Sequence, residues 1–418
     1  MDHAIAVIDI GKTRSKLTLW SNEGVLLRQL DRVNARPVDD ELPQLDLAGI
    51  GAWLMAGLDN FASGADIAAL VPVGHGAAAV LMDGETPIAA LDYEAPIPEA
   101  VAAAYDFERD PFEATLSPRL EGGLNLGAQL FWLEQLYPEF WPGEGRVLLW
   151  PQYWAWVLSG RIACEVTSLG CHSDLWRPLE RRFSDLAQRR GWAGRLGPLM
   201  GAGEVLGPVR RAVSEATGIS ADCRVYCGLH DSNAALHAAR GLGELGGRAF
   251  SVVSTGTWFI CMGAGGSGPA AYNPGEDMLA NIDIAGTPTP TARFMGGRDY
   301  ETWMGRALGA TSKVELLEQA AGLADWTGAT PALRATRAAL ELARRADHAL
   351  TLIAAQGPIL IEGRFAADEA FSAALAALRP RQSLYRSPLA DGVALGALRL
   401  AAGDAVALPP LERITRAG

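Results

Sequence analysis

Cysteine is scarce in this sequence of 418 residues, which contains only Cys164, Cys171, Cys223, Cys227 and Cys261. An odd number of cysteines, with no secretory signal at the start of the sequence, favours reduced thiols and a cytoplasmic location. Cys223 and Cys227 have no second pair of cysteine or histidine residues nearby, so the sequence does not predict a zinc site.

The sequence also lacks a long apolar run and an excess of basic residues. The most apolar long segment, residues 147–158, is about a dozen residues, too short to span a bilayer. The net charge of −12 and the isoelectric point near 5.1 argue against nucleic-acid or anionic-membrane partners, because phosphate groups attract clustered Lys and Arg. The composition is typical of a soluble globular protein of roughly two or three domains.

Four common motifs of nucleotide-binding and hydrolytic enzymes are absent. The sequence contains no GxxxxGK[ST], no GxGxxG after a predicted strand, no GxSxG and no HExxH. The P-loop, Rossmann, serine-hydrolase and zincin interpretations therefore lose their main support.

The opening segment AIAVIDIGKTRSKLTLW, residues 4–20, predicts an apolar strand, a tight turn and a second strand. Polar groups gather at this turn: Asp9, Gly11, Lys12, Thr13 and Lys16. Backbone N–H groups, hydroxyls and an ammonium form a phosphate seat, and an adjacent carboxylate suits a divalent cation. The alternative is an ordinary hairpin with a polar turn.

Two further segments fit the same chemistry. Residues 249–262, AFSVVSTGTWFICM, repeat the strand–turn–strand pattern around Thr255, Gly256 and Thr257. GLHDSNAAL places Asp231 at the end of a strand and the start of a helix, where helix capping is the alternative to catalysis. Two such turns would clamp the phosphates of a nucleotide, with Mg²⁺ near Asp9 and Asp231 as the base.

The remaining patterns predict an α/β chain. A buried strand at 67–73 delivers Gly74-His75-Gly76 to the sheet edge where ligands bind in open α/β sheets. The 95–127 segment, with four prolines, predicts a long excursion, and a basic helix at 179–191 is interpreted as a solvated face. Further helices are predicted at 47–61, 126–137, 313–324, 330–347, 367–378 and 395–402, further strands at 281–285 and 357–361, and a loop at 31–45.

The sequence resembles the FGGY carbohydrate kinases of the actin-like ATPase superfamily. DIGKTRSKL, GLHDSNAAL and STGTW carry the resemblance, and GHGAAAVLMDGETPIAALDYE, LGAQLFWLEQLYPEF, PQYWAWVLSG and NIDIAG follow in the family's order. The resemblance covers nearly the whole chain. It implies two actin-like (ribonuclease H-like) α/β domains around a central cleft: residues 1–241 with the sugar site and catalytic base, and residues 242–418 with the nucleotide site.

The resemblance also implies roles for individual residues. Asp231 matches the base that takes a proton from the sugar hydroxyl, and Asp9 lies near Mg²⁺ and the γ-phosphate. The implied ATP contacts are Asp9, Gly11, Lys12, Thr13, Lys16, Thr255, Gly256, Thr257, Gly297 and Gly363. At Glu362-Gly363 only one glycine stands where the family has a glycine-rich adenine contact.

The implied sugar contacts are His75, Gly76, Asp92, Gln152, His230 and Asp231. His75 is the expected direct contact, with a satisfied core histidine as the alternative, and Gln152 either lines the pocket or is a core amide. Among the branches of the family, the motifs with Lys12 and HDSN are most similar to those of the L-fuculose and L-rhamnulose kinases.

We therefore predict an ATP- and Mg²⁺-dependent kinase of a small sugar, with a pentulose or polyol kinase as the alternative. A non-kinase actin-like ATPase or a sugar sensor is a further alternative. The expected partners are the sugar and ATP, with no nucleic acid and no membrane. Apolar faces in this Ala-rich chain are compatible with a homodimer.

Overall fold

A computed structural model describes residues 3–35 and 42–415, and the chain forms two compact units. The first unit comprises Met1–Gly241, Ala280–Pro288 and Asp391–Leu408. The second comprises Leu242–Leu279, Thr289–Ala390 and Pro409–Gly418. The sequence predicted one boundary, between 241 and 242. The first boundary lies there, and the chain then returns twice to the first unit.

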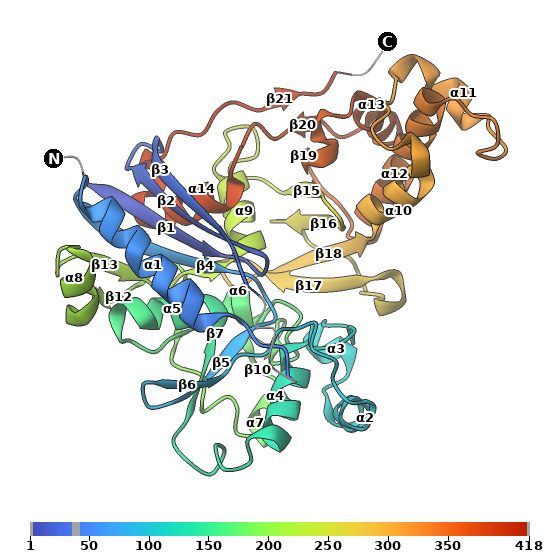
Figure 1. Ribbon diagram of the computed structural model, residues 1–418. Coiled ribbons are helices and arrows are strands. Elements are labelled where there is room, and N and C mark those ends of the chain that lie inside the picture. Colours follow the sequence, from blue (N-terminus) through green and yellow to red (C-terminus); the bar gives the residue numbers. More distant parts are fainter. Residues whose placement is uncertain (1–2, 36–41, 416–418) are drawn as a thin grey trace. The chain divides into compact units, whose positions relative to one another are not determined.

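The first unit is built on a sheet with the strand order β12-β13-β4-β1-β2-β3 (Figure 1). β1 pairs antiparallel with β2 and parallel with β4, which in turn pairs parallel with β13 and with a short strand β14. The central position of β1 explains its continuous apolar run, because both faces of a central strand are buried. The strands are β1 Ala4–Ile10, β2 Arg14–Ser21, β3 Leu26–Val33, β4 Ile67–Gly74, β12 Val205–Pro208, β13 Arg224–Tyr226 and β14 Leu229–His230.

Helices cover both faces of this sheet (Figure 1). One side carries α1 (Leu47–Ala62) and α5 (Trp150–Ser159), with α8 (Arg211–Thr217) against α1. The other side carries α9 (Asp231–Arg240) and α14 (Gly392–Ala402). These two helices pack closely because Gly396 has no side chain: a Cβ there would lie 1.7 Å from the Ala234 carbonyl oxygen. A helix from the end of the chain therefore supports the helix that begins at Asp231.

A smaller region of the first unit has its own apolar core. It surrounds a sheet of order β6-β5-β7. Its elements are β5 Ala79–Asp83, β6 Thr86–Ala89, β7 Arg146–Leu149, β8 Cys164–Glu165, β9 Trp176–Arg177, β10 Arg182–Phe183, β11 Leu199–Met200, α2 Glu99–Glu108, α3 Phe112–Thr115, α4 Leu126–Leu136, α6 Val166–Leu169 and α7 Asp185–Arg189.

The second unit is built on a sheet with the strand order β17-β18-β16-β15-β19-β20-β21. Its strands are β15 Phe250–Thr255, β16 Phe259–Ala264, β18 Pro288–Phe294, β19 Ile359–Gly363, β20 Leu384–Arg386 and β21 Glu412–Arg413, and β17 (Met278–Ile282) contains the passage of the chain to the first unit. Its helices are α10 Gly296–Met304, α11 Leu317–Ala321, α12 Pro331–Leu352 and α13 Glu369–Leu378. Among the described helices, none is long and apolar enough to cross a membrane.

The two sheets share one topology. In each, an antiparallel hairpin leads to a third antiparallel strand, and the next two strands lie parallel to the first: β3-β2-β1-β4-β13 and β18-β16-β15-β19-β20. The two segments that the sequence predicted to echo each other, residues 4–20 and 249–262, are the equivalent hairpins. This is the α/β architecture that the sequence predicted for each domain.

The structure adds detail to one predicted segment and corrects another. Within the predicted excursion 95–127 lie α2 and α3, and each follows a proline, because a proline before the first turn does not interrupt a helix. The predicted helix 179–191 is reduced to α7, since Arg181 has a positive φ of 52° and β10 follows it.

Other boundaries also differ from prediction. Helix 313–324 is reduced to the turn η3 (Val314–Leu316) and α11, and strand 281–285 lies earlier, as β17. β3 extends into the predicted loop 31–45, of which residues 36–41 lie outside the described chain.

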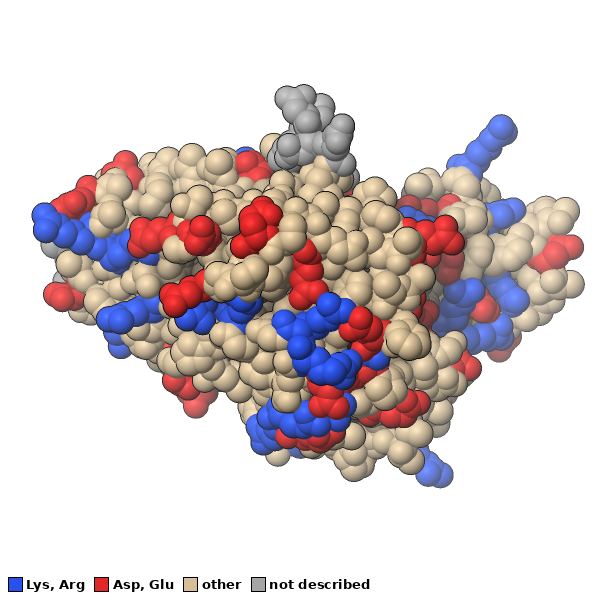
Figure 2. Space-filling view, turned by 90° about the horizontal axis from the view of Figure 1, so that it is seen from below, with Lys and Arg blue, Asp and Glu red and all other residues tan. Residues whose placement is uncertain are grey.

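The basic segment near α7 is electrically neutralised. Arg182 contacts Asp185 at 2.7 Å, and Arg190 contacts Glu134 at 3.0 Å and also pairs with Glu108. On the face of the described chain that Figure 2 shows, basic and acidic side chains are interspersed. This arrangement agrees with the interpretation of the segment as an ordinary charged surface.

Candidate active site

The first predicted phosphate turn is Gly11-Lys12-Thr13, between the end of β1 and the start of β2. A Cβ at Gly11 would lie 2.7 Å from the Arg14 carbonyl oxygen, so the turn requires glycine there. The Asn34 side-chain amide donates to the carbonyl oxygens of Gly11 at 2.8 Å and Lys12 at 3.2 Å. Sequence reasoning missed Asn34, which lies beyond β3 and reaches the turn only through strand pairing.

Asp9 precedes this turn in an environment that favours its protonated form. Burial and the charges of Asp231 and Asp391 raise the pKa of Asp9 to about 7, whereas the Lys16 ammonium lowers it. Lys16 faces Asp9 in the strand register, and its Nζ lies 2.7 Å from Asp391 Oδ2. The structure therefore brings Asp9, Lys16 and Asp231 together and adds Asp391, which the sequence analysis did not identify.

Asp231 is the first residue of α9, where the partial positive charge of a helix N-terminus favours a carboxylate. Its side chain is 31% exposed, and its Oδ1 accepts a hydrogen bond from the Ser232 N–H at 2.5 Å. His230 Nε2 lies 3.2 Å from the same oxygen. The carboxylate is thus fixed in place and still open to a substrate.

A buried network holds the segment that leads to Asp231. The His230 N–H donates to Thr167 Oγ1 at 3.0 Å, and that hydroxyl donates to Glu165 Oε2 at 2.6 Å. Burial raises the pKa of Glu165 to about 7. Gln152 is fully buried, and its amide donates to the carbonyl oxygens of Cys227 and Gly228. Sequence reasoning missed Glu165 and Thr167, which short-range patterns do not connect to His230.

Lys12, one of the implied ATP contacts, lies against the predicted sugar-binding segment around Asp92. Its Nζ lies 2.8 Å from Asp92 Oδ1, 2.7 Å from Glu94 Oε1 and 3.9 Å from the centre of the Tyr93 ring. The side chains of Lys12 and Asp92 are each 8% exposed, whereas that of Glu94 is 56% exposed. The Tyr93 ring in turn meets His75 edge-on at 5.7 Å.

His75 and Gly76 lie at the end of β4, beside His230. His75 Nδ1 is 2.8 Å from the Gly76 carbonyl oxygen, and burial lowers the pKa of His75. Its Nε2 is buried and has no hydrogen-bond partner among the described residues. A Cβ at Gly76 would lie 2.4 Å from Cys171 Sγ and 3.0 Å from His230 Nε2, so a larger residue would displace both.

The second predicted phosphate turn, in the second unit, is supported by two glycines. Gly297 donates its N–H to the Thr257 carbonyl oxygen at 3.0 Å, and a Cβ there would lie 2.3 Å from the Gly256 carbonyl oxygen. Gly363 has a φ of +81°, and a Cβ there would lie 2.4 Å from the Thr255 carbonyl oxygen. The predicted nucleotide residues of this unit therefore form one contiguous structure.

The described residues contain no cluster of three or more His, Cys, Asp or Glu side chains spaced to enclose a metal ion. Mg²⁺ does not require such a cluster, because it commonly binds one or two carboxylates, several waters and the phosphates of a substrate. Asp9 fits this pattern, since it is a half-buried carboxylate beside Asp231 and Asp391, and a bound cation would offset the repulsion that raises its pKa.

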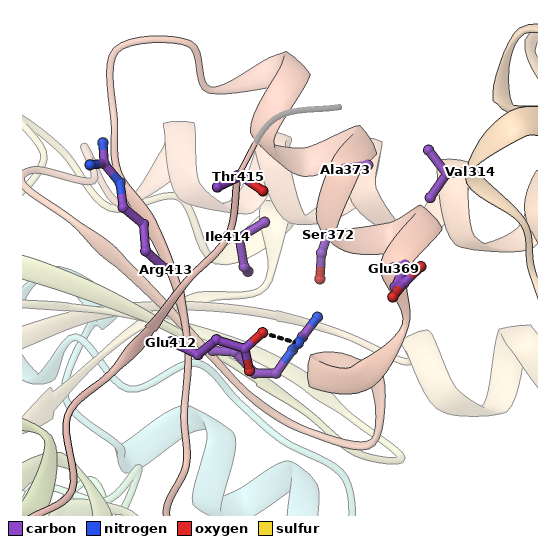
Figure 3. Close-up of a pocket in the computed structure, with 9 residues that line it drawn as sticks. Val314, Glu369, Ser372, Ala373, Glu412, Arg413, Ile414 and Thr415 are labelled. Carbon is purple, nitrogen blue, oxygen red and sulfur yellow. Dashed lines mark hydrogen bonds and ion pairs between the residues drawn. The ribbon is translucent and has the colours of Figure 1, made fainter. Parts of the chain in front are cut away.

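A cavity of about 300 Å³ lies elsewhere in the second unit, among α13, β20 and β21 (Figure 3). An ion pair of 2.7 Å between Arg386 and Glu412 crosses it. None of the predicted site residues lines it; the lining residues are Val314, Glu369, Ser372, Ala373, Arg386, Glu412, Arg413, Ile414 and Thr415.

The sequence matches a known family. The carbohydrate kinase FGGY C-terminal domain matches residues 247–326 and 318–409. A comparison with curated proteins found no match.

Solved structures extend the similarity to the whole chain. A carbohydrate kinase from Novosphingobium aromaticivorans is 40% identical, with 99% of this chain and 94% of that chain covered and a TM-score of 0.92. Two less similar structures share the fold. A xylulose kinase from Rhodospirillum rubrum is 16% identical, with 99% of this chain and 94% of that chain covered and a TM-score of 0.78. Plasmodium falciparum glycerol kinase with ADP is 12% identical, with 96% of this chain and 89% of that chain covered and a TM-score of 0.75. The chain therefore belongs to the FGGY carbohydrate kinase family, as the sequence motifs predicted, and is a sugar kinase.

Proposed function

We propose that this sugar kinase transfers the γ-phosphate of ATP to a hydroxyl of a small neutral ketose, with Asp231 as the catalytic base. A (deoxy)ketose such as L-fuculose or L-rhamnulose is the proposed acceptor. The observation that carries the proposal is the position of Asp231, an accessible carboxylate at a helix N-terminus, in the same unit as Asp9 and His75.

Phosphoryl transfer needs positioning, charge neutralisation and a base for the proton of the nucleophile. Asp231 would accept the proton of the sugar hydroxyl, and the phosphates of ATP would bind the backbone N–H groups of the first turn and Lys16. Asp9 would hold Mg²⁺, which when bound neutralises phosphate charge. Thr255, Gly256 and Thr257 form the second proposed phosphate contact.

The charges of the segments proposed to bind the sugar, around Lys12, Asp92 and Asp231, favour a neutral sugar over a sugar acid. Among the described residues of these segments, the one ammonium is Lys12, and Asp92 and Glu94 already pair with it. Asp231 adds a further negative charge, so the carboxylate of an aldonic acid would meet net repulsion. We assign Lys12 to the acceptor side of the site on the same contacts.

The aromatic surroundings of His75 support a ketose with a methyl group. Lys12 Nζ covers one face of the half-buried Tyr93 ring, and the rest of the ring offers an apolar surface edge-on to His75, beside a polar ring nitrogen. A 6-deoxyketose presents both a methyl group and hydroxyls. Pentuloses such as xylulose or ribulose, and polyols, lack this methyl group and are the alternatives.

ADP release measured against a panel of sugars tests the proposal. The panel contains deoxyketoses, pentuloses, polyols and gluconate, with ATP and Mg²⁺ in excess. We expect the highest kcat/KM for a neutral ketose and no sugar-dependent release with gluconate. Gluconate as the best acceptor would contradict the charge argument, and ATP hydrolysis independent of every sugar would favour the non-kinase ATPase.

The five cysteines are all buried free thiols, which supports the proposed cytoplasmic location.

A further inference from the structure

Lysine is rare in this chain. The sequence has 36 Lys and Arg residues in total. Lys12, Lys16 and Lys313 are the lysines, and all the others are arginines. Two of the three lysines lie in the first hairpin, and different carboxylates hold them. Asp92 and Glu94 hold Lys12, whereas Asp391 holds Lys16.

Asp391 performs two tasks with its two carboxylate oxygens. Oδ1 accepts the Ala394 N–H at 2.9 Å and thereby caps α14, and Oδ2 lies 2.7 Å from Lys16 Nζ. The Asp391 side chain is 16% exposed and that of Lys16 is 31% exposed, so solvent screens this pair only in part. Asp391 is also the first residue of the segment that returns to the first unit.

Other carboxylates compete for Lys16. The strand register places Lys16 between Asp9 on β1 and Asp31 on β3, and both acids act on it electrostatically. An ammonium without Asp391 would turn to one of these two acids. Pairing with Asp9 would place a positive charge on the carboxylate that is proposed to hold the cation.

We propose that Asp391 is a positioning residue that holds the Lys16 ammonium beside the first phosphate turn and away from Asp9. This inference rests on the proposed function, in which Lys16 contacts phosphate. A fixed ammonium stabilises developing charge in the transition state without reorganisation, whereas a mobile one must first be oriented.

Asp391→Asn tests the inference, because asparagine caps helices as well as aspartate and the variant therefore loses only the charge. We expect kcat to fall by at least about tenfold and the KM for sugar to stay within about twofold of wild type. The KM for ATP should change less than kcat, since loss of the carboxylate also removes repulsion of the phosphates. A kcat equal to that of wild type would overturn the proposal.

A double variant separates positioning from a direct effect. If Asp391 acts through Lys16, Lys16→Met with Asp391→Asn loses no more kcat than Lys16→Met alone. Additive losses would show that Asp391 acts by another route and would overturn the proposal.

Asp46 provides a matched control. It caps α1, pairs with Arg32 and belongs to the same unit. Asp46→Asn makes the same chemical change at a helix cap and should leave kcat unchanged. An equal loss of kcat in this variant would mean that general weakening of a cap explains the effect, and the proposal would be wrong.

Amine acylation followed by mass spectrometry tests the ion pair between Lys16 and Asp391 in the absence of sugar. Lys313, whose side chain is 53% exposed, serves as the internal reference. We expect Asp391→Asn to raise acylation of Lys16 relative to Lys313 even if Lys16 turns to Asp9 or Asp31, because Asp391 raises the pKa of Lys16 more than either of these acids does. Unchanged acylation would contradict the ion pair. The predicted change in a protein that phosphorylates no sugar would support the ion pair and overturn the proposed function instead.

Discussion

Replacement of Lys12 by methionine tests the buried ion pair with Asp92. Methionine keeps most of the side-chain volume but leaves the carboxylate of Asp92, whose side chain is 8% exposed, without its cation. Removal of one partner from a buried pair costs about 3–5 kcal/mol. We expect about 3 kcal/mol, at the low end, because Asp92 keeps a hydrogen bond from the Glu94 N–H at 2.8 Å.

Tryptophan fluorescence during urea unfolding measures this loss. Nine of the 12 tryptophans lie in the first unit (20, 53, 132, 141, 150, 154, 156, 176 and 192), so the signal reports mainly on that unit. With an m-value of about 3 kcal/mol per M, a loss of 3 kcal/mol lowers the midpoint by about 1 M.

Two further variants make this result specific. Lys12→Met with Asp92→Asn removes both charges and should restore the midpoint. Lys313→Met removes a lysine whose pair with Glu315 is 4.0 Å long and exposed, and should leave the midpoint unchanged. A Lys12→Met midpoint equal to that of wild type, or a double variant that stays destabilised, would refute the reasoning.

Two other predictions concern one residue in each unit. Burial raises the pKa of Glu165 to about 7, from an unperturbed 4.5, so between these values the folded protein binds a proton that the unfolded chain has released. Glu165 should therefore lower stability by up to about 1.4 kcal/mol per pH unit as pH rises from 5 to 7, and Asp9, whose pKa is also about 7, should add a similar fall. Glu165→Gln should reduce this slope in urea unfolding at each pH by the share of Glu165, and an unchanged slope would contradict the assignment. In the second unit, Gly297→Ala would place a Cβ 2.3 Å from the Gly256 carbonyl oxygen and should weaken ATP binding in calorimetry, whereas Gly322→Ala, whose Cβ has ordinary contacts at 3.7 Å, should not. Equal ATP affinities of these two variants would contradict the proposal that the turn at Thr255, Gly256 and Thr257 binds phosphate.

Local sequence patterns predicted the hairpins and the order of the principal elements well. The apolar character of β1 and β15 identifies both as strands, because buried strands leave little choice of residue. The glycine of the first turn was visible for a similar reason, since the close backbone contact at Gly11 excludes a side chain.

Contacts between distant segments could not be predicted. α14 was expected as a small-residue helix near the end of the chain, but nothing in its sequence shows that it returns to the first unit and packs on α9. Asp391 consequently looked like an ordinary residue before a helix. Glu165 was missed because its connection to His230 passes through Thr167, and only the fold brings these residues together.

The predicted basic helix at 179–191 shows a different limit. Its arginines and apolar residues fit a helical pattern, but Arg181 has a positive φ of 52° and Arg182–Phe183 pair as β10 with β9, so only Asp185–Arg189 is helical. Tertiary interactions outweigh helix propensity, which contributes only a few tenths of a kcal/mol per residue.

The Asp231→Asn variant tests the central claim most directly. Asparagine is similar in size and is accepted at helix starts, so a purely structural role of Asp231 predicts a folded protein with turnover retained. If Asp231 is the base, sugar-dependent ADP release falls by at least about a hundredfold while ATP binding in calorimetry stays within about twofold of wild type. Turnover near the wild-type rate in this variant would contradict Asp231 as the catalytic base.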